Sequence, residues 1–188
     1  MSNKAVFLDR DGTINVEKNY LYKIEEFEYM PGVLEGLKLL NDNGYLLVII
    51  TNQSGIARGY YTEEQYVKLN HWLVDDLRKR GIDIAGSYYC PHHPNAAVKR
   101  YRINCECRKP GIALFEKAIR ELDITPEKSY AIGDKERDLE ICKKTDVRGF
   151  LIGCNNSGED FEGNIVMESG GVLEVAKRII KLDYGKVD

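Results

Sequence analysis

The chain has 188 residues, a net charge of −3 and 43% hydrophobic residues, a composition typical of one globular domain with a sizeable core. The mildly acidic balance gives no electrostatic footprint for nucleic acid, and no apolar run approaches the roughly 20 residues of a membrane span. The first residues, MSNKAVFLDRDG, lack a secretory pattern. We therefore expect one domain over residues 1–188, cytoplasmic and monomeric, without nucleic-acid or membrane partners.

The first predicted element is a buried strand that ends on two carboxylates. Residues 5–13 read AVFLDRDGT, an apolar run that leads to Asp9, Asp11 and a glycine turn. Both acids should leave the carboxyl end of the strand together, where open parallel sheets bind ligands. One can then stay an ionised nucleophile while the other holds a proton to donate. An Asp-Gly turn with solvated acids is the alternative; a calcium loop is excluded, because Ile14 and Tyr20 occupy its glycine and glutamate positions.

Helices and strands alternate along the rest of the chain. Apolar runs predict four further strands at 45–50, 84–89, 129–132 and 149–152. Apolar spacing and caps predict helices at 33–43, 62–80 and 112–122, one ending near Thr145, and one at 172–180. We interpret 155–164, which is rich in glycine, asparagine and serine, as a loop. The pattern predicts an α/β fold, with a Rossmann-like parallel sheet and helices on both faces.

Polar residues follow several of these strands. Thr51-Asn52 ends the second strand, and Gly133-Asp134 ends the fourth. Carboxylates at strand ends are the hard oxygen ligands that magnesium prefers, so Asp9 and Asp134 are candidates to bind it, with Asp138 one helical turn further supporting the site. Lys109 can direct its ammonium group at a phosphoryl group. Taken singly, each is an ordinary turn, cap or surface residue; their joint order favours a site.

Three of the five cysteines cluster with histidine in one irregular stretch. Three sulfurs and one imidazole match a closed, structural zinc site, for which we expect four ligands: Cys90, His92, Cys105 and Cys107. His93 is the rival of His92. Cys142 and Cys154 are expected to be reduced thiols without a metal.

Four segments together resemble the motifs of the haloacid dehalogenase-type phosphatases: DRDGT, ITNQSG, CRKP and IGDKERD, between Asp9 and Asp138. The inserted loop at 90–107 resembles the histidinol-phosphatase and heptose-bisphosphate phosphatase branch, which binds structural zinc and has a minimal cap. The resemblance implies that Asp9 forms an aspartyl phosphate and that Asp11 is the general acid and base. It further implies two sets of ligands: the phosphoryl oxygens bind Thr51, Asn52 and Lys109, and Mg²⁺ binds Asp9, the Asp11 carbonyl and Asp134.

The segments TNQSGIARGYYTEEQ and CPHHP are more similar to the heptose-bisphosphate members of that branch. This implies cleavage of the 7-phosphate of a heptose 1,7-bisphosphate in nucleotide-heptose synthesis, with Arg108 and Arg58 on the phosphate that is not cleaved. Histidinol phosphate or another small phosphosugar is the alternative substrate, and an inactive zinc-stabilised binding module is the alternative class. After Lys109-Pro110 the chain reads Gly111-Ile112-Ala113, where the family commonly shows a Pro-Gly pair.

Overall fold

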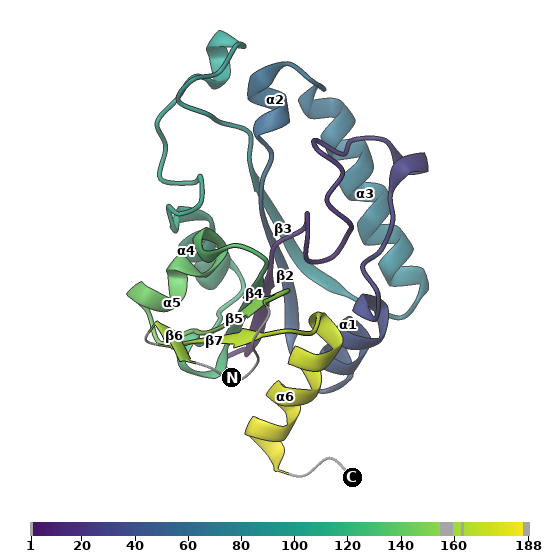
Figure 1. The fold of residues 1–188 in the computed structure, drawn as a ribbon, viewed down its shortest axis with the longest axis vertical. Helices are drawn as coiled ribbons and strands as arrows, with labels where there is room; N and C mark the ends of the chain where they lie inside the picture. Colours follow the sequence, from purple (N-terminus) through teal and green to yellow (C-terminus); the bar gives the residue numbers. More distant parts are fainter. Residues whose placement is uncertain (1, 155–159, 163, 186–188) are drawn as a thin grey trace.

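The computed structural model describes residues 2–154, 160–162 and 164–185. Within them, one sheet of seven strands runs in the order β3-β2-β1-β4-β5-β7-β6 (Figure 1). Neighbouring strands pair in parallel except β6, which is antiparallel to β7. The strands are β1 (Ala5–Leu8), β2 (Leu46–Asn52), β3 (Ile84–Cys90), β4 (Tyr130–Gly133), β5 (Arg148–Ile152), β6 (Asp160–Glu162) and β7 (Ile165–Glu168). The predicted parallel α/β fold is confirmed.

Helices cover both faces of this sheet, because the central strands are apolar on both sides. Val6 and Leu8 of β1 pack into one core with α1 (Val33–Asp42), α3 (Glu63–Lys79) and α6 (Val172–Tyr184). Ala5 and Phe7, which point the other way, pack into a second core with α4 (Ala113–Glu121) and α5 (Glu140–Lys144). Two hydrophobic layers therefore fix the sheet from both sides.

Helix α3 begins where the sequence predicted. The Thr62 hydroxyl accepts a hydrogen bond from the Gln65 backbone N–H at 3.2 Å, and the Gln65 side chain accepts one from the Thr62 N–H at 2.8 Å. This reciprocal capping box satisfies two backbone donors that the first helical turn leaves unpaired.

The structure differs from the predicted elements at three places. A short helix, α2 (Ser54–Arg58), directly follows β2, and the helix expected to end near Thr145 is divided into a 3₁₀ turn (Glu136–Leu139) and α5. Strand β6 lies within the stretch we interpreted as a loop and β7 directly follows that stretch, so five predicted strands was too few. Residues 155–159 and 163 of that stretch lie outside the described residues.

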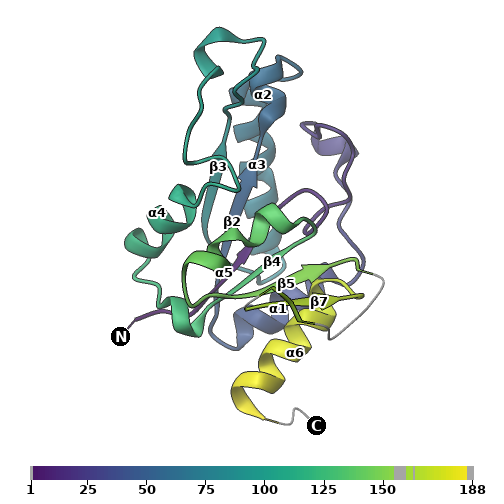
Figure 2. The ribbon, with the colours of Figure 1, turned by 60° about the vertical axis from the view of Figure 1, so that its left-hand side comes forward.

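Two long connections rise beyond the carboxyl ends of the strands. One joins β1 to α1 and contains a 3₁₀ turn (Ile24–Glu26); the other joins β3 to α4 and contains another (Lys99–Tyr101). Both lie away from the two chain ends (Figure 2). A third 3₁₀ turn, Pro126–Lys128, precedes β4. Within the described residues, no helix combines the length and apolarity needed to cross a bilayer.

Candidate active site

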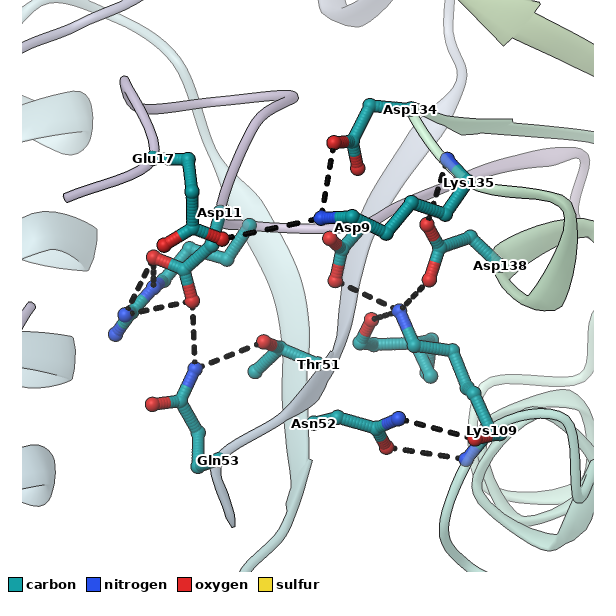
Figure 3. A network of polar contacts seen from close by, with 12 residues as sticks. Asp9, Asp11, Glu17, Thr51, Asn52, Gln53, Lys109, Asp134, Lys135 and Asp138 are labelled. Atoms are coloured by element: carbon teal, nitrogen blue, oxygen red, sulfur yellow. Dashed lines mark hydrogen bonds and ion pairs between the residues drawn. The ribbon is translucent and has the colours of Figure 1, made fainter. Parts of the chain in front are cut away.

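The predicted acids and polar residues meet at the carboxyl edge of the sheet (Figure 3). Asp9 follows β1, and its N–H donates to the Ile132 carbonyl of β4 at 3.1 Å. This bond aligns the ends of β1 and β4, so that Asp134 and Asp138 lie beside Asp9. One carboxylate oxygen of each acid lies within 4.8 Å of the others. We call Asp9, Asp134, Asp138 and Lys109 the acidic cluster.

Lys109 is the buried cation of this cluster, with only 2% of its surface exposed. Its ammonium nitrogen lies 2.7 Å from Asp9 Oδ1, 2.8 Å from Asp138 Oδ1 and 2.6 Å from the Ile50 carbonyl oxygen. Three donors therefore have three acceptors. Burial lowers the pKa of Lys109, but the charges of Asp9 and Asp138 outweigh burial and raise the pKa above its ordinary value.

Asn52 holds the backbone of the same lysine. Its side-chain oxygen accepts from the Lys109 N–H at 3.0 Å, and its side-chain nitrogen donates to the Lys109 carbonyl at 3.1 Å. The carboxyl end of β2 is thereby joined to the segment that carries Lys109. The expected contact of Asn52 with a phosphoryl oxygen stays a prediction.

Asp11 lies in a second polar network, around a fully buried arginine. The Arg10 guanidinium lies 2.7 Å from Asp11 Oδ1, Asn15 donates to the same oxygen at 3.1 Å, and Gln53 donates to Oδ2 at 2.9 Å. Gln53 also donates to the Thr51 hydroxyl at 2.9 Å. Asp11 is thus fixed by residues of its own turn and by the end of β2.

The pKa shifts of the two acids run in opposite directions. Burial raises the pKa of Asp9 to about 7, with help from the charges of Asp138 and Asp11 and against that of Lys109. Burial also raises the pKa of Asp11, but the charge and hydrogen bonds of Arg10 outweigh it and hold that pKa below its ordinary value. The pKa values of the two acids are separated, as expected. However, Asp9 has the higher pKa and Asp11 the lower, whereas a general acid at Asp11 needs the opposite order. The cause is the ion pair between Asp11 and Arg10.

The acidic cluster has the donor set of a divalent cation site. Asp9 and Asp138 share the Lys109 ammonium group and Asp134 lies beside that of Lys135, and buried like charges need a cation beside them. Asp134 Oδ1 is buried and has no hydrogen-bond partner among the residues that the structure describes. A Cβ at Gly12 would lie 2.4 Å from Asp134 Oδ2, and one at Gly133 would lie 2.4 Å from the Asp138 Cβ. Only glycine at these two positions leaves room for the Asp134 and Asp138 side chains. The hard carboxylate oxygens of the cluster suit Mg²⁺.

Sulfur and imidazole ligands form a separate group beside this site, which we call the thiol cluster: Cys90, His92, Cys105 and Cys107. Cys90 Sγ lies 3.6 Å from Cys105 Sγ and 3.3 Å from Cys107 Sγ, and His92 Nδ1 lies 3.3 Å from Cys107 Sγ. All four ligand atoms lie within 4.8 Å of one another, a spacing that suits one tetrahedral ion.

His93, the rival ligand, points elsewhere. Its Nδ1 accepts from the Asn95 N–H at 3.1 Å, and its Nε2 lies 3.3 Å from an Arg58 nitrogen. His92 is therefore the imidazole that joins the sulfurs.

A cavity of about 450 Å³ opens over the acids and contains four cationic side chains. Arg58 and Arg108 were predicted from the sequence; Lys135 and Arg137 were not, although both lie in the segment IGDKERD. Lys135 Nζ lies 3.1 Å from Asp134 Oδ2 and 3.8 Å from Glu17 Oε2. In Figure 3 the Lys135 ammonium group lies between these two carboxylates. Burial lowers the pKa of Arg108, and the charges of Arg137 and Arg58 add to that shift. The guanidinium groups among these cations are suited to bind a phosphate group.

Comparisons with known proteins find relatives over most of the chain. A family model described as Polynucleotide kinase 3 phosphatase matches residues 4–149. A D-glycero-beta-D-manno-heptose-1,7-bisphosphate 7-phosphatase of Haemophilus ducreyi is 46% identical over 149 residues, 79% of this chain and 81% of that protein. A D-glycero-alpha-D-manno-heptose-1,7-bisphosphate 7-phosphatase of Photorhabdus laumondii is 41% identical over 177 residues, 94% of this chain and 96% of that protein.

Among solved structures, a D,D-heptose 1,7-bisphosphate phosphatase from B. bronchiseptica, complexed with magnesium and phosphate, superposes with a TM-score of 0.79 at 26% identity. The match covers 95% of this chain and 99% of that one.

The fold and the site together define a phosphatase of the haloacid dehalogenase type, which hydrolyses phosphate esters. Its relatives narrow the class further. The chain belongs to the Polynucleotide kinase 3 phosphatase family and, within it, to the heptose-bisphosphate phosphatases. The predicted family, fold class and enzyme class are confirmed.

Proposed function

We propose that this phosphatase removes the 7-phosphate of D-glycero-D-manno-heptose 1,7-bisphosphate, for nucleotide-heptose synthesis in the cytoplasm. The observation that carries the proposal is the convergence of Asp9, Thr51, Lys109 and Asp134 from four distant segments. The relatives named for both anomers of this substrate support the choice of sugar. We treat residues 1–188 as one phosphatase domain, with 90–107 as its inserted loop.

In the first proposed step, a carboxylate oxygen of Asp9 attacks the phosphorus of the 7-phosphate and the ester P–O bond breaks. Asp11 donates a proton to the departing sugar oxygen, which leaves as a hydroxyl group. A phosphate dianion bound in the cavity would oppose the effect of Arg10, because a nearby negative charge favours the protonated form of Asp11. In the second step, Asp11 takes a proton from water, whose oxygen attacks phosphorus and releases Asp9 and inorganic phosphate.

The groups around Asp9 would stabilise the charge on the phosphoryl oxygens. We assign Thr51 and Asn52 to these oxygens, and Lys109, already paired with Asp9, to the same task. Asp9, the Asp11 backbone carbonyl and Asp134 would hold Mg²⁺, which when bound offsets the negative charge of the transition state. Asp138 keeps Lys109 in place.

The remaining predicted residues have two proposed roles: some would bind the rest of the substrate, and the others would hold the metal ion that stabilises the inserted loop. Arg108 and Arg58 line the same cavity as the acids, and guanidinium groups suit the phosphate that stays on carbon 1. Cys90, His92, Cys105 and Cys107 would hold a structural Zn²⁺ with no open coordination position.

The test is phosphate release with Mg²⁺ from both anomers of the heptose 1,7-bisphosphate and from histidinol phosphate. We expect the bisphosphate to be preferred, and its product to be the 1-phosphate. A large preference for histidinol phosphate would overturn the proposed substrate while leaving the proposed chemistry at Asp9 intact.

A further inference from the structure

Two tyrosine rings lie against each other at the cavity. The large apolar side chains that are exposed in the described part of the chain are Tyr20, Tyr60, Ile103, Leu182 and Tyr184. Of these five, Tyr20 alone lines the cavity that contains Asp9. Its ring centroid lies 4.6 Å from that of Tyr60, which comes from the segment after α2. The pair leaves 39% of Tyr20 and 55% of Tyr60 exposed.

The backbone at this point is unusual. Asn19 and Tyr20 have φ angles of 50° and 73°, in the left-handed region. Asparagine tolerates this region, but a bulky aromatic residue there is an outlier with an energetic cost. Packing on Tyr60 covers Tyr20 only in part, since 39% of it stays exposed.

Contacts around the cavity hold this conformation. The Asn19 N–H donates to Glu17 Oε1 at 3.0 Å, and the Glu17 carboxylate faces Lys135, 3.8 Å away. The Tyr20 ring packs on Tyr60. The strained segment is therefore attached to the catalytic edge on one side and to the α2 segment on the other.

A second tyrosine pair, Tyr22 and Tyr61, connects to the residues that hold Asp11. Tyr22 stacks on Tyr61 with centroids 5.4 Å apart, and the Tyr61 hydroxyl donates to Gln53 Oε1 at 2.6 Å. Gln53 in turn donates to Asp11 Oδ2. Tyr20 and Tyr61 both line the cavity, so its polar floor has an aromatic side.

We propose that Tyr20, supported by Tyr60, is a specificity residue that contacts the carbon skeleton of the leaving group. A sugar presents apolar C–H groups, which pack on the face of an aromatic ring, whereas the phosphate groups need the cations on the cavity floor. This inference rests on the proposed hydrolysis of a phosphosugar. The ring, and not the hydroxyl group, makes the contact.

The test compares Tyr20→Ala, Tyr20→Phe and Tyr60→Ala with Tyr184→Ala, a control tyrosine that is 58% exposed and lies at the end of α6. The readouts are KM and kcat for the heptose 1,7-bisphosphate, and the inhibition constant of inorganic phosphate, which has no carbon skeleton. We expect Tyr20→Ala to raise KM about five- to tenfold, with kcat and the phosphate inhibition constant unchanged. Tyr60→Ala should raise KM less, and Tyr20→Phe and Tyr184→Ala should match the wild type.

An unchanged KM in Tyr20→Ala, or an equal rise in KM and in the phosphate inhibition constant, would overturn the inference. A rise in KM in Tyr20→Phe as large as that in Tyr20→Ala would also overturn it, because the contact would then be made by the hydroxyl group. A wild-type enzyme that does not hydrolyse the bisphosphate would instead refute the proposed substrate.

Discussion

The acidic cluster and the thiol cluster lie close together but are built in opposite ways. The acidic cluster joins segments from Asp9 to Asp138, and its two buried carboxylates, those of Asp9 and Asp138, share the Lys109 ammonium group. The thiol cluster comes from the single stretch 90–107 and brings together soft ligands. The first is an arrangement of charged groups suited to catalysis, and the second has the ligands that a structural zinc ion would need.

The two clusters are connected through three consecutive residues. Cys107 belongs to the thiol cluster and Lys109 to the acidic cluster, with Arg108, which lines the cavity, between them. Asn52 fixes the backbone of this segment from β2. We infer that the thiol cluster affects catalysis by position, whereas the acidic cluster affects it directly. Substitutions in each cluster should separate these effects.

The largest effect is expected from Asp9→Asn. The amide cannot attack phosphorus, so kcat/KM should fall by about 10⁴-fold or more. Lys109 keeps Asp138 as its partner at 2.8 Å, and the melting temperature should stay close to that of the wild type. Steady-state phosphate release and thermal unfolding measure the two quantities. Magnesium-dependent turnover at the wild-type rate in this variant would contradict the assignment.

Lys109→Met should reduce both activity and stability. Removal of the ammonium group takes away one stabiliser of transition-state charge, for a loss of about 10²–10³-fold in kcat. It also leaves Asp9 and Asp138 without their buried partner, for about 3–5 kcal/mol in the free energy of unfolding. Lys117→Met is the matched control, because Lys117 is half exposed and lies 3.9 Å from Glu121. Equal denaturant midpoints for both variants would refute the structural role of Lys109.

Cys107→Ser should have a smaller effect on activity than either substitution in the acidic cluster. Loss of one ligand should release zinc and lower the melting temperature, while the displaced loop lowers kcat by about 10²-fold or less. Metal analysis of the purified protein gives the zinc content, and Cys154→Ser is the control outside the cluster. Full zinc content in Cys107→Ser would show that Cys107 is not a ligand.

The smallest effect is expected at the opposite, amino edge of the sheet. Tyr130 begins β4, and its hydroxyl donates to Asp183 Oδ1 of α6 at 2.6 Å. Tyr130→Phe should cost about 1 kcal/mol in the free energy of unfolding and leave kcat/KM unchanged. Chemical denaturation with a parallel activity assay tests this. A fall in activity would show that catalysis depends on more than the carboxyl edge.

Much of the fold follows from local patterns in the sequence. The apolar run 5–8 predicts β1, and the capping box at Thr62 predicts the start of α3, because each signal is contained in a few neighbouring residues. Strands β6 and β7 could not be predicted in the same way. They are short and lie in a stretch rich in turn residues, and their pairing with each other and with β5 is a tertiary contact.

The candidate site was predictable as a set of residues but not as a set of contacts. Parallel strands bring their carboxyl ends to one edge, which places Asp9 and Asp134 together. Nothing local indicates that Arg10 is fully buried and paired with Asp11, or that Asn52 binds the Lys109 backbone. These contacts join distant parts of the chain or depend on burial, so they appear only in the folded structure.

The central claim is that the carboxylate of Asp9 accepts the phosphoryl group. The most direct test is acid quenching of Asp11→Asn during reaction with the heptose 1,7-bisphosphate and Mg²⁺, followed by peptide mass mapping. Because this substitution slows hydrolysis of the intermediate, we predict a phosphoryl group on the peptide that contains Asp9, and its absence in the double variant with Asp9→Asn. Turnover with no phosphorylated Asp9, or with the phosphoryl group on another residue, would contradict the account.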